Sequence, residues 1–253
     1  MTGTESSSKG KARGYAKLAL VFAGILILYL AGQGICTAAS QALSLQAAPL
    51  YLTNSLAFGA LTILAYKKLF HKAPSWCTCA RGLIVSAVFS AAAIAFLDAF
   101  YALHFCRAFP SNAVTQLLMA AAAGIGEEVL FRGFLFDYIS KKASLLRGLI
   151  VISVVFGCAH LLNAISGQTV TALYIFNCMT AGFFLCVLYY EYGLVPALIY
   201  HISWNAIFNG GNTVESKPLT GIILVIAGLA ILLIEEKIKR RPSAITDTKE
   251  QIR

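Results

Sequence analysis

Residues 117–136 read LLMAAAAGIGEEVLFRGFLF, and this segment indicates the class of fold. It has the length of about 20 residues that an α-helix needs to cross the hydrocarbon core of a bilayer. The segment is apolar or glycine except for Glu127, Glu128 and Arg132. Ionisable side chains are costly inside a membrane span and usually serve a function there. The segment therefore predicts a membrane helix that carries a functional site.

The composition of the 253-residue chain supports a membrane protein. Hydrophobic residues make up 58% of the chain, charged residues make up 12%, and the mean hydropathy is +0.75. Soluble globular proteins contain about 45–50% apolar and about 25% charged residues. So little charge excludes a soluble enzyme and a disordered chain. The net charge of +9 lies in the termini and short loops, so no nucleic-acid partner is expected.

Long apolar runs predict an all-α polytopic membrane protein with about eight transmembrane helices. The predicted spans are 18–39, 48–66, 83–103, 113–139, 146–163, 170–190, 194–209 and 219–236. The first run also resembles a signal peptide, but its length favours a retained helix. We expect one membrane domain, 18–236, between basic tails at 1–17 and 237–253.

The distribution of basic residues predicts the topology. With the N-terminus inside, seventeen Lys and Arg residues fall in inner segments and two fall in outer loops. Cytoplasmic segments carry the excess of basic residues in membrane proteins. Both termini are therefore predicted to be cytoplasmic, in a multi-pass protein of the cell membrane. The basic tails are expected to contact anionic lipids.

Helical spacing relates the polar residues inside the spans. Glu128 and Arg132 are four residues apart, so they share a helical face in the favourable acid-before-base order. Glu127 points about 100° away from Glu128, which leaves it free for chemistry. His201 and Asn205 are also four apart and share a face.

Depth in the membrane indicates that these groups meet. At a rise of about 1.5 Å per residue, Glu128, His160 and the His201/Asn205 pair lie roughly 15–21 Å from the cytoplasmic ends of their helices. Hydrolysis is the chemistry that fits. Glu127 could act as general base on a water that His160 holds. His201 and Asn205 could donate hydrogen bonds to an oxyanion.

Three motifs resemble those of the CPBP family, which comprises the CAAX-type prenyl endopeptidases and similar bacteriocin-processing or immunity proteins. The motifs are Glu127-Glu128-x-x-x-Arg132-Gly133, Phe156-x-x-x-His160 and His201-x-x-x-Asn205. Their order, spacing and residue types match. The resemblance covers a catalytic core of about residues 115–209.

The resemblance implies an intramembrane glutamate peptidase. Its substrate would be a membrane-associated, lipidated (CAAX-type) or secreted peptide precursor. The implied roles are water activation by Glu127 and His160, support by Glu128 and Arg132, an oxyanion hole of His201 and Asn205, and a site wall of Phe156 and Phe131.

Alternatives to this interpretation stay open. The two glutamates and two histidines are residue types that can bind zinc. The helix-borne His-Glu-x-x-His pattern of zinc proteases is absent, however. We therefore predict no metal or cofactor. A non-catalytic immunity or scaffold protein of the same fold is one other function, and a proton-coupled transporter is another. The sequence does not predict an oligomeric state.

Overall fold

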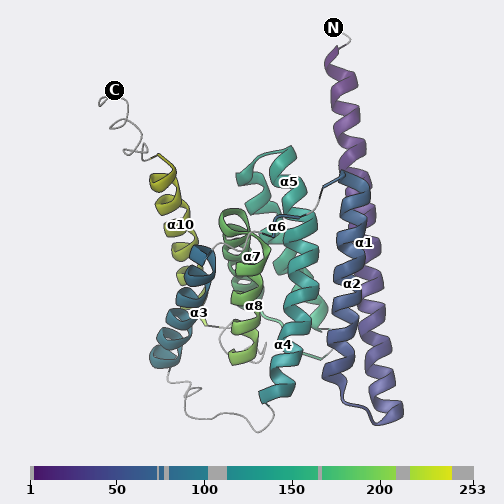
Figure 1. Cartoon of the computed structure of the whole chain (residues 1–253), viewed down its shortest axis with the longest axis vertical. Coiled ribbons are helices and arrows are strands. Elements are labelled where there is room, and N and C mark those ends of the chain that lie inside the picture. Colours follow the sequence, from purple (N-terminus) through teal and green to yellow (C-terminus); the bar gives the residue numbers. More distant parts are fainter. Residues whose placement is uncertain are drawn as a thin grey trace, which may run out of the picture.

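A computed structural model describes residues 3–72, 74–76, 80–101, 113–164, 167–208 and 217–240, and every regular element in these ranges is helical (Figure 1). The elements are α1 (Gly3–Leu43), α2 (Ala47–Phe70), α3 (Ala80–Tyr101), α4 (Ala113–Glu128), the π-helix η2 (Val129–Phe136), α5 (Asp137–Lys142), α6 (Leu145–Ala159), the 3-10 helix η3 (His160–Ala164), α7 (Ala172–Tyr192), α8 (Leu194–Phe208) and α10 (Pro218–Arg240). The prediction of an all-helical protein is confirmed.

Six helical segments are long and apolar enough to cross a membrane. They are Gly14–Leu43, Ala47–Phe70, Ala113–Lys142, Leu145–Ala164, Ala172–Tyr192 and Leu219–Arg240. The two other predicted spans correspond to shorter apolar stretches, Ala80–Phe96 of α3 and Leu194–Phe208. These helices indicate a multi-pass membrane protein, and the count of eight crossings stays a prediction.

The two ends of the chain extend the predicted helices. Helix α1 begins at Gly3, within the segment predicted as a basic tail, and α10 continues to Arg240. Residues 241–253 of the predicted C-terminal tail lie outside the described residues. Figure 1 shows the start of α1, the end of α10 and the short helix α5 at one end of the bundle. Which side of the membrane this end faces stays a prediction.

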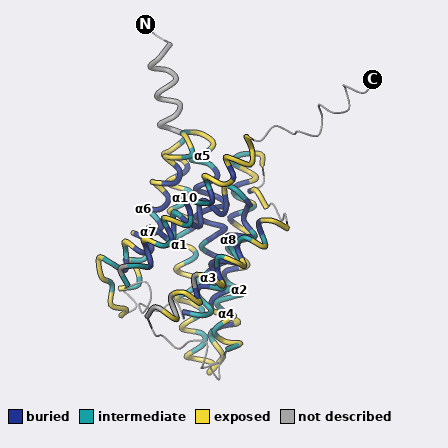
Figure 2. The backbone as a smooth tube through the Cα atoms, turned by 90° about the vertical axis from the view of Figure 1, so that its left-hand side faces the viewer, coloured by how far each residue is buried: buried dark blue, intermediate teal, exposed yellow. Residues whose placement is uncertain are grey.

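The core lies around α7 and the π-helix η2, which are the most buried elements of the bundle. All eight residues of η2 are buried, as are twelve residues of α7. Figure 2 shows the buried segments inside the bundle and the exposed residues along its outer helices. Large apolar side chains such as Leu20 (75% exposed) and Ile27 (66% exposed) cover the outside of α1. Such a surface suits contact with lipid rather than water.

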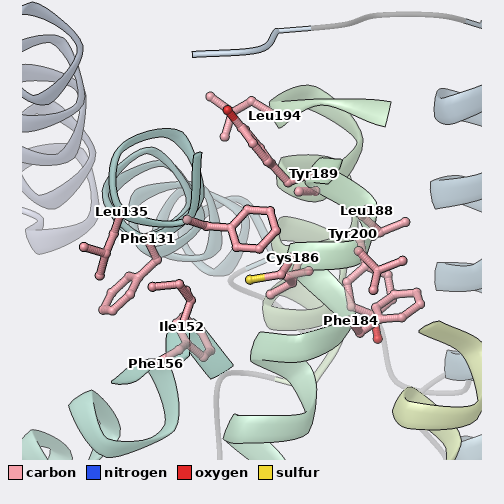
Figure 3. Close-up of a cluster of buried hydrophobic side chains, with 14 of the residues drawn as sticks. Phe131, Leu135, Ile152, Phe156, Phe184, Cys186, Leu188, Tyr189, Leu194 and Tyr200 are labelled. Carbon is pink, nitrogen blue, oxygen red and sulfur yellow. The ribbon is translucent and has the colours of Figure 1, made fainter. Parts of the chain in front are cut away.

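Aromatic and aliphatic side chains fill this core (Figure 3). Phe134 and Phe136 of η2 are fully buried, and Phe184 and Leu188 of α7 are buried in the same cluster. The core therefore fixes the position of η2, and with it Arg132 inside this element and the two glutamates directly before it.

The π-helix is a departure from the predicted regular helix 113–139. The backbone N–H of Asp137 donates to the carbonyl of Arg132, five residues back, which is the π pattern. π-Segments insert an extra residue per turn and occur frequently at functional sites. Here the π-helix starts directly after Glu128, so it changes the direction of the side chains that follow.

A glycine allows α4 and α8 to approach each other. A Cβ atom on Gly124 would lie 2.8 Å from Cγ1 of Ile202 and 3.7 Å from its backbone nitrogen. Real Cβ contacts are not that short, so a larger residue would push α8 away. This approach brings Glu127 and Glu128, at the end of α4, next to His201 on α8.

Candidate active site

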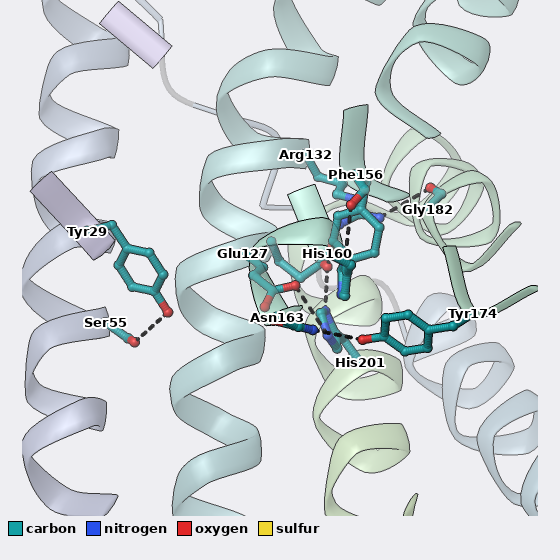
Figure 4. Close-up of polar contacts among 11 residues, drawn as sticks. Tyr29, Ser55, Glu127, Arg132, Phe156, His160, Asn163, Tyr174, Gly182 and His201 are labelled. Atoms are coloured by element: carbon teal, nitrogen blue, oxygen red, sulfur yellow. Dashed lines mark hydrogen bonds and ion pairs between the residues drawn. The ribbon is translucent and has the colours of Figure 1, made fainter. Parts of the chain in front are cut away.

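Side chains from α4, η2, α6 and α8 meet in the middle of the bundle (Figure 4). Helix α4 contributes the two adjacent glutamates and η2 contributes Arg132. His160 lies where α6 passes into the 3-10 helix η3, and His201 lies in the middle of α8. The structure thus brings together polar residues that are up to 78 positions apart in the sequence, from Glu127 to Asn205.

Glu128 is the centre of a buried ion-pair cluster. Its side chain is fully buried, and its Oε1 accepts a hydrogen bond from Arg132 Nη1 at 2.8 Å. The same oxygen lies 2.6 Å from Nδ1 of His201. Because a carboxylate only accepts, Nδ1 of His201 is the donor. The predicted Glu128–Arg132 contact is confirmed, and the contact with His201 was not predicted.

Arg132 has no solvent exposure and is held on three sides. Its Nη2 donates to the carbonyl of Gly182 on α7 at 3.2 Å. Its guanidinium carbon lies 4.1 Å from the centre of the Phe156 ring, a distance typical of a cation–π contact. Phe156 therefore supports the ion pair directly, in addition to lining a cavity beside His160 and His201.

Glu127 is oriented differently from Glu128. Its side chain is 26% exposed, and its Oε2 lies 3.9 Å from Nε2 of His201, beyond hydrogen-bond distance. Buried Oε2 atoms of both glutamates lack a hydrogen-bond partner among the described residues. Glu128 nevertheless has two donors on its other oxygen. The carboxylate of Glu127 is thus the one left available to a molecule in the site.

The main-chain carbonyl of Phe156 orients His160. It lies 2.8 Å from Nδ1 of His160, and since a carbonyl only accepts, Nδ1 carries the proton. The other ring nitrogen, Nε2, is then an acceptor in the neutral ring. The rings of the two residues also pack edge-on with centroids 4.7 Å apart, a side-chain contact that the spacing of four residues in the Phe156-x-x-x-His160 motif permits.

Two cavities meet at His160. The first has a volume of about 120 Å³ and is lined by Glu127, His160 and apolar residues that include Phe131. The second has a volume of about 50 Å³ and is lined by His160, His201 and Asn205. Cavities of this size that have several polar groups in their lining have room for water. The predicted base and the predicted oxyanion donors therefore line adjacent spaces with His160 between them.

The remaining predicted residues also lie at these cavities. Asn205 is half-buried and lines the second cavity together with His201. Phe131 is buried, and its ring packs edge-on against Phe156 with centroids 5.1 Å apart. All eight residues singled out in the sequence thus lie in or beside one site, while their catalytic roles stay predictions.

A second buried acid was missed by the sequence analysis. Asp137, directly after η2, is 2% exposed. It accepts hydrogen bonds from the hydroxyls of Tyr66 and Tyr189, the latter at 3.0 Å, and from Lys141 at 2.7 Å. Its place in the predicted span 113–139, four residues before a lysine, was the available signal.

Tyr29 of α1 was missed as well. It lines the first cavity with Glu127 and His160, although the motifs contain no residue from α1. Nothing in the local sequence around Tyr29 distinguishes it from an aromatic residue that faces lipid.

The site has no arrangement typical of a bound metal. Within the described ranges, no group of three His, Cys, Asp or Glu side chains is placed to hold a metal ion. Glu128 and His201, which could serve as ligands, are hydrogen-bonded to each other. These two potential metal ligands therefore contact each other rather than a common point between them.

Comparison with known proteins finds a family match for the part of the chain that carries the site. Residues 109–207 match the family model described as type II CAAX prenyl endopeptidase Rce1-like. Over this segment, which is less than half of the chain, the sequence is similar to that family. No curated protein and no solved structure matches the chain significantly. The Rce1-like segment includes every predicted site residue, from Glu127 to Asn205, and the resemblance to the CAAX proteases is confirmed. The family is one of proteases, which supports a peptidase in general.

Proposed function

We propose that the protein is an intramembrane endopeptidase in which Glu127 activates a water to hydrolyse a peptide bond. The observation that carries the proposal is the difference between the two glutamates. Glu128 is buried with donors from Arg132 and His201, whereas Glu127 faces a cavity that it shares with His160. A general base needs a free carboxylate beside a space for water, and the cavity next to Glu127 supports this role.

The first step is attack on the peptide carbonyl. A water in the first cavity would donate one hydrogen bond to Glu127 and one to Nε2 of His160, the acceptor nitrogen of that ring. Glu127 takes a proton as the water oxygen forms a bond to the carbonyl carbon. The proton then passes from Glu127 to the leaving amine as the carbon–nitrogen bond breaks.

Charge on the carbonyl oxygen would be stabilised from the second cavity. Asn205 offers an amide donor there. His201 already donates through Nδ1 to Glu128, so its Nε2 donates only when the ring is doubly protonated. Carboxylate oxygens face both ring nitrogens, Glu128 Oε1 at 2.6 Å from Nδ1 and Glu127 Oε2 at 3.9 Å from Nε2. Glu128 would thus prepare His201 as a donor, in addition to pairing with Arg132.

The substrate that fits is a peptide at the membrane. The cavity beside Glu127 is lined mainly by apolar side chains, and the helices around it are apolar enough to span a bilayer. A membrane-associated or lipidated precursor, or a secreted peptide before release, could present an extended segment there. Anionic lipids would be partners of the basic ends of the helices.

Comparison of membrane proteomes from cells with wild-type protein and cells with Glu127→Gln tests the proposal. We expect uncut precursors to accumulate with E127Q, because glutamine cannot accept the proton. Glu236→Gln is the matched control, since Glu236 is exposed and pairs with Arg240 at the end of α10. Normal cleavage by well-expressed E127Q would refute the proposal. A deletion phenotype fully rescued by E127Q would instead indicate a binding or immunity function.

A further inference from the structure

Tyr29 connects the first helix to the candidate active site. It lies on α1, outside the Rce1-like segment 109–207, yet it lines the same cavity as Glu127 and His160. Figure 4 shows its ring reaching from α1 toward α4, the helix that carries Glu127. A tyrosine at this wall brings a hydroxyl group to a cavity whose other α1 residues, Leu26 and Leu30, are apolar.

The Tyr29 side chain is held in place from α2. Its hydroxyl lies 3.4 Å from Oγ of Ser55, which is fully buried. Asn54 donates to the backbone carbonyl of Tyr29 at 3.5 Å, and Gln33 is a second polar neighbour of the phenol. The hydroxyl is therefore anchored at the interface between α1 and α2, rather than left to rotate toward lipid.

The glycine before Glu127 makes room for this phenol. A Cβ atom on Gly126 would lie 2.7 Å from the Tyr29 hydroxyl oxygen and 2.8 Å from two of its ring atoms. Any other residue at position 126 would displace the ring. The phenol thus packs directly against the backbone of α4, one residue before the proposed base.

We propose that the Tyr29 hydroxyl donates a hydrogen bond to the water that Glu127 activates. This inference rests on the proposed peptidase function. A water that donates to Glu127 and to Nε2 of His160 has two lone pairs left on its oxygen. If Ser55 donates to the Tyr29 oxygen, the phenolic proton is free for one lone pair, and the other attacks the carbonyl carbon. Tyr29 is then a catalytic residue supplied by α1.

Kinetics of Tyr29→Phe test the inference. The probe is the precursor that accumulates most in the Glu127→Gln proteome, made as a synthetic peptide and presented to purified protein in liposomes. Y29F removes one oxygen and keeps the ring against Gly126. We expect kcat to fall about ten- to a hundredfold, because the attacking water is no longer held in one orientation, with KM within about twofold. Ser55→Ala should lower kcat by a smaller factor, because it only releases the phenol.

Tyr51→Phe is the matched control. The Tyr51 hydroxyl lies 2.5 Å from Oγ1 of Thr37, so it also forms a hydrogen bond between α1 and α2, but it lies outside both cavities. Y51F should leave kcat and KM unchanged. If E127Q is inactive but Y29F keeps the wild-type kcat, the role of Tyr29 is overturned and the proposed function stands. Equal losses of kcat in Y29F and Y51F would overturn the role of Tyr29 as well. Activity in E127Q itself would remove the proposed function and this inference with it.

Discussion

Glu127 and Glu128 are adjacent in the chain, yet only Glu128 is fixed by close hydrogen bonds, from Arg132 at 2.8 Å and from His201 at 2.6 Å. Glu127 approaches the same histidine only to 3.9 Å and faces a cavity. Two carboxylates in opposite environments are suited to different tasks. One organises the charged groups, and the other is free to exchange a proton.

Neutralising the two glutamates should therefore have different effects on stability. Glu128→Gln leaves Arg132 buried without its counter-ion, and breaking a buried pair in this way costs about 3–5 kcal/mol. Glu127→Gln removes no close hydrogen bond found within the described residues. We expect a lower midpoint of thermal unfolding in detergent for E128Q and an unchanged midpoint for E127Q. Equal midpoints in the two variants would contradict this division of roles.

Arg132→Lys should not preserve the site, although it preserves the charge. The guanidinium contacts Glu128, the Gly182 carbonyl and the Phe156 ring at once. A lysine ammonium is a compact point charge without the planar fork, so it loses at least one of these contacts. We expect R132K to unfold at a lower temperature and to lose most of its peptidase activity. Lys237→Arg, which exchanges the same two residue types in the opposite direction at the basic end of α10, is the control and should leave stability and activity unchanged.

The positions of the helices could be predicted from the sequence because the length and position of the apolar runs indicate them. The span predicted at 170–190 is α7, Ala172–Tyr192, and the span predicted at 146–163 is α6 with η3. The contact between Glu128 and Arg132 was also predictable, since four residues separate the two side chains on one helix. These features depend on the spacing of residues along the chain, which can be read from the sequence.

Contacts between helices could not be predicted in the same way. The hydrogen bond between Glu128 and His201 depends on the rotation of α8 against α4, and no spacing rule within one helix contains it. The π-helix at Val129–Phe136 shifts the later side chains, and a regular period of 3.6 residues does not anticipate it. Tyr29 joins the site only through the packing of α1 against α2 and α4.

The close approach of α4 and α8 predicts that Gly124→Ala destabilises the protein. Alanine gains about 0.5–1 kcal/mol in helix propensity, but its Cβ would lie 2.8 Å from Ile202 Cγ1, and overpacking costs about 1–3 kcal/mol. We expect a net loss of stability and of activity in G124A, measured by thermal unfolding and peptide cleavage.

Two further variants separate packing from propensity at this position. Gly24→Ala is the control, since a Cβ there meets nothing within 4 Å in the described part of the chain. It should be neutral or slightly stabilising. The double variant Gly124→Ala with Ile202→Ala should recover stability relative to G124A, because the truncated side chain removes the clash. Failure of this rescue would show that the helices do not meet at Gly124 as described.

Asp137→Asn should destabilise the end of the π-helix. The carboxylate accepts hydrogen bonds from Tyr66 of α2 and Tyr189 of α7, and the Tyr189 oxygen accepts in turn from the backbone N–H of Ser75 at 3.0 Å. Hydrogen bonds to a charged group contribute about 1.5–3 kcal/mol each, so D137N weakens links among three segments. Lys141→Ala should have a smaller effect, because Lys141 is 52% exposed, so solvent screens its charge, and the two tyrosine hydroxyls still donate to Asp137. Thermal unfolding of both variants decides between these contributions: a larger loss in K141A than in D137N would mean that the ion pair, and not the two tyrosines, holds the buried acid.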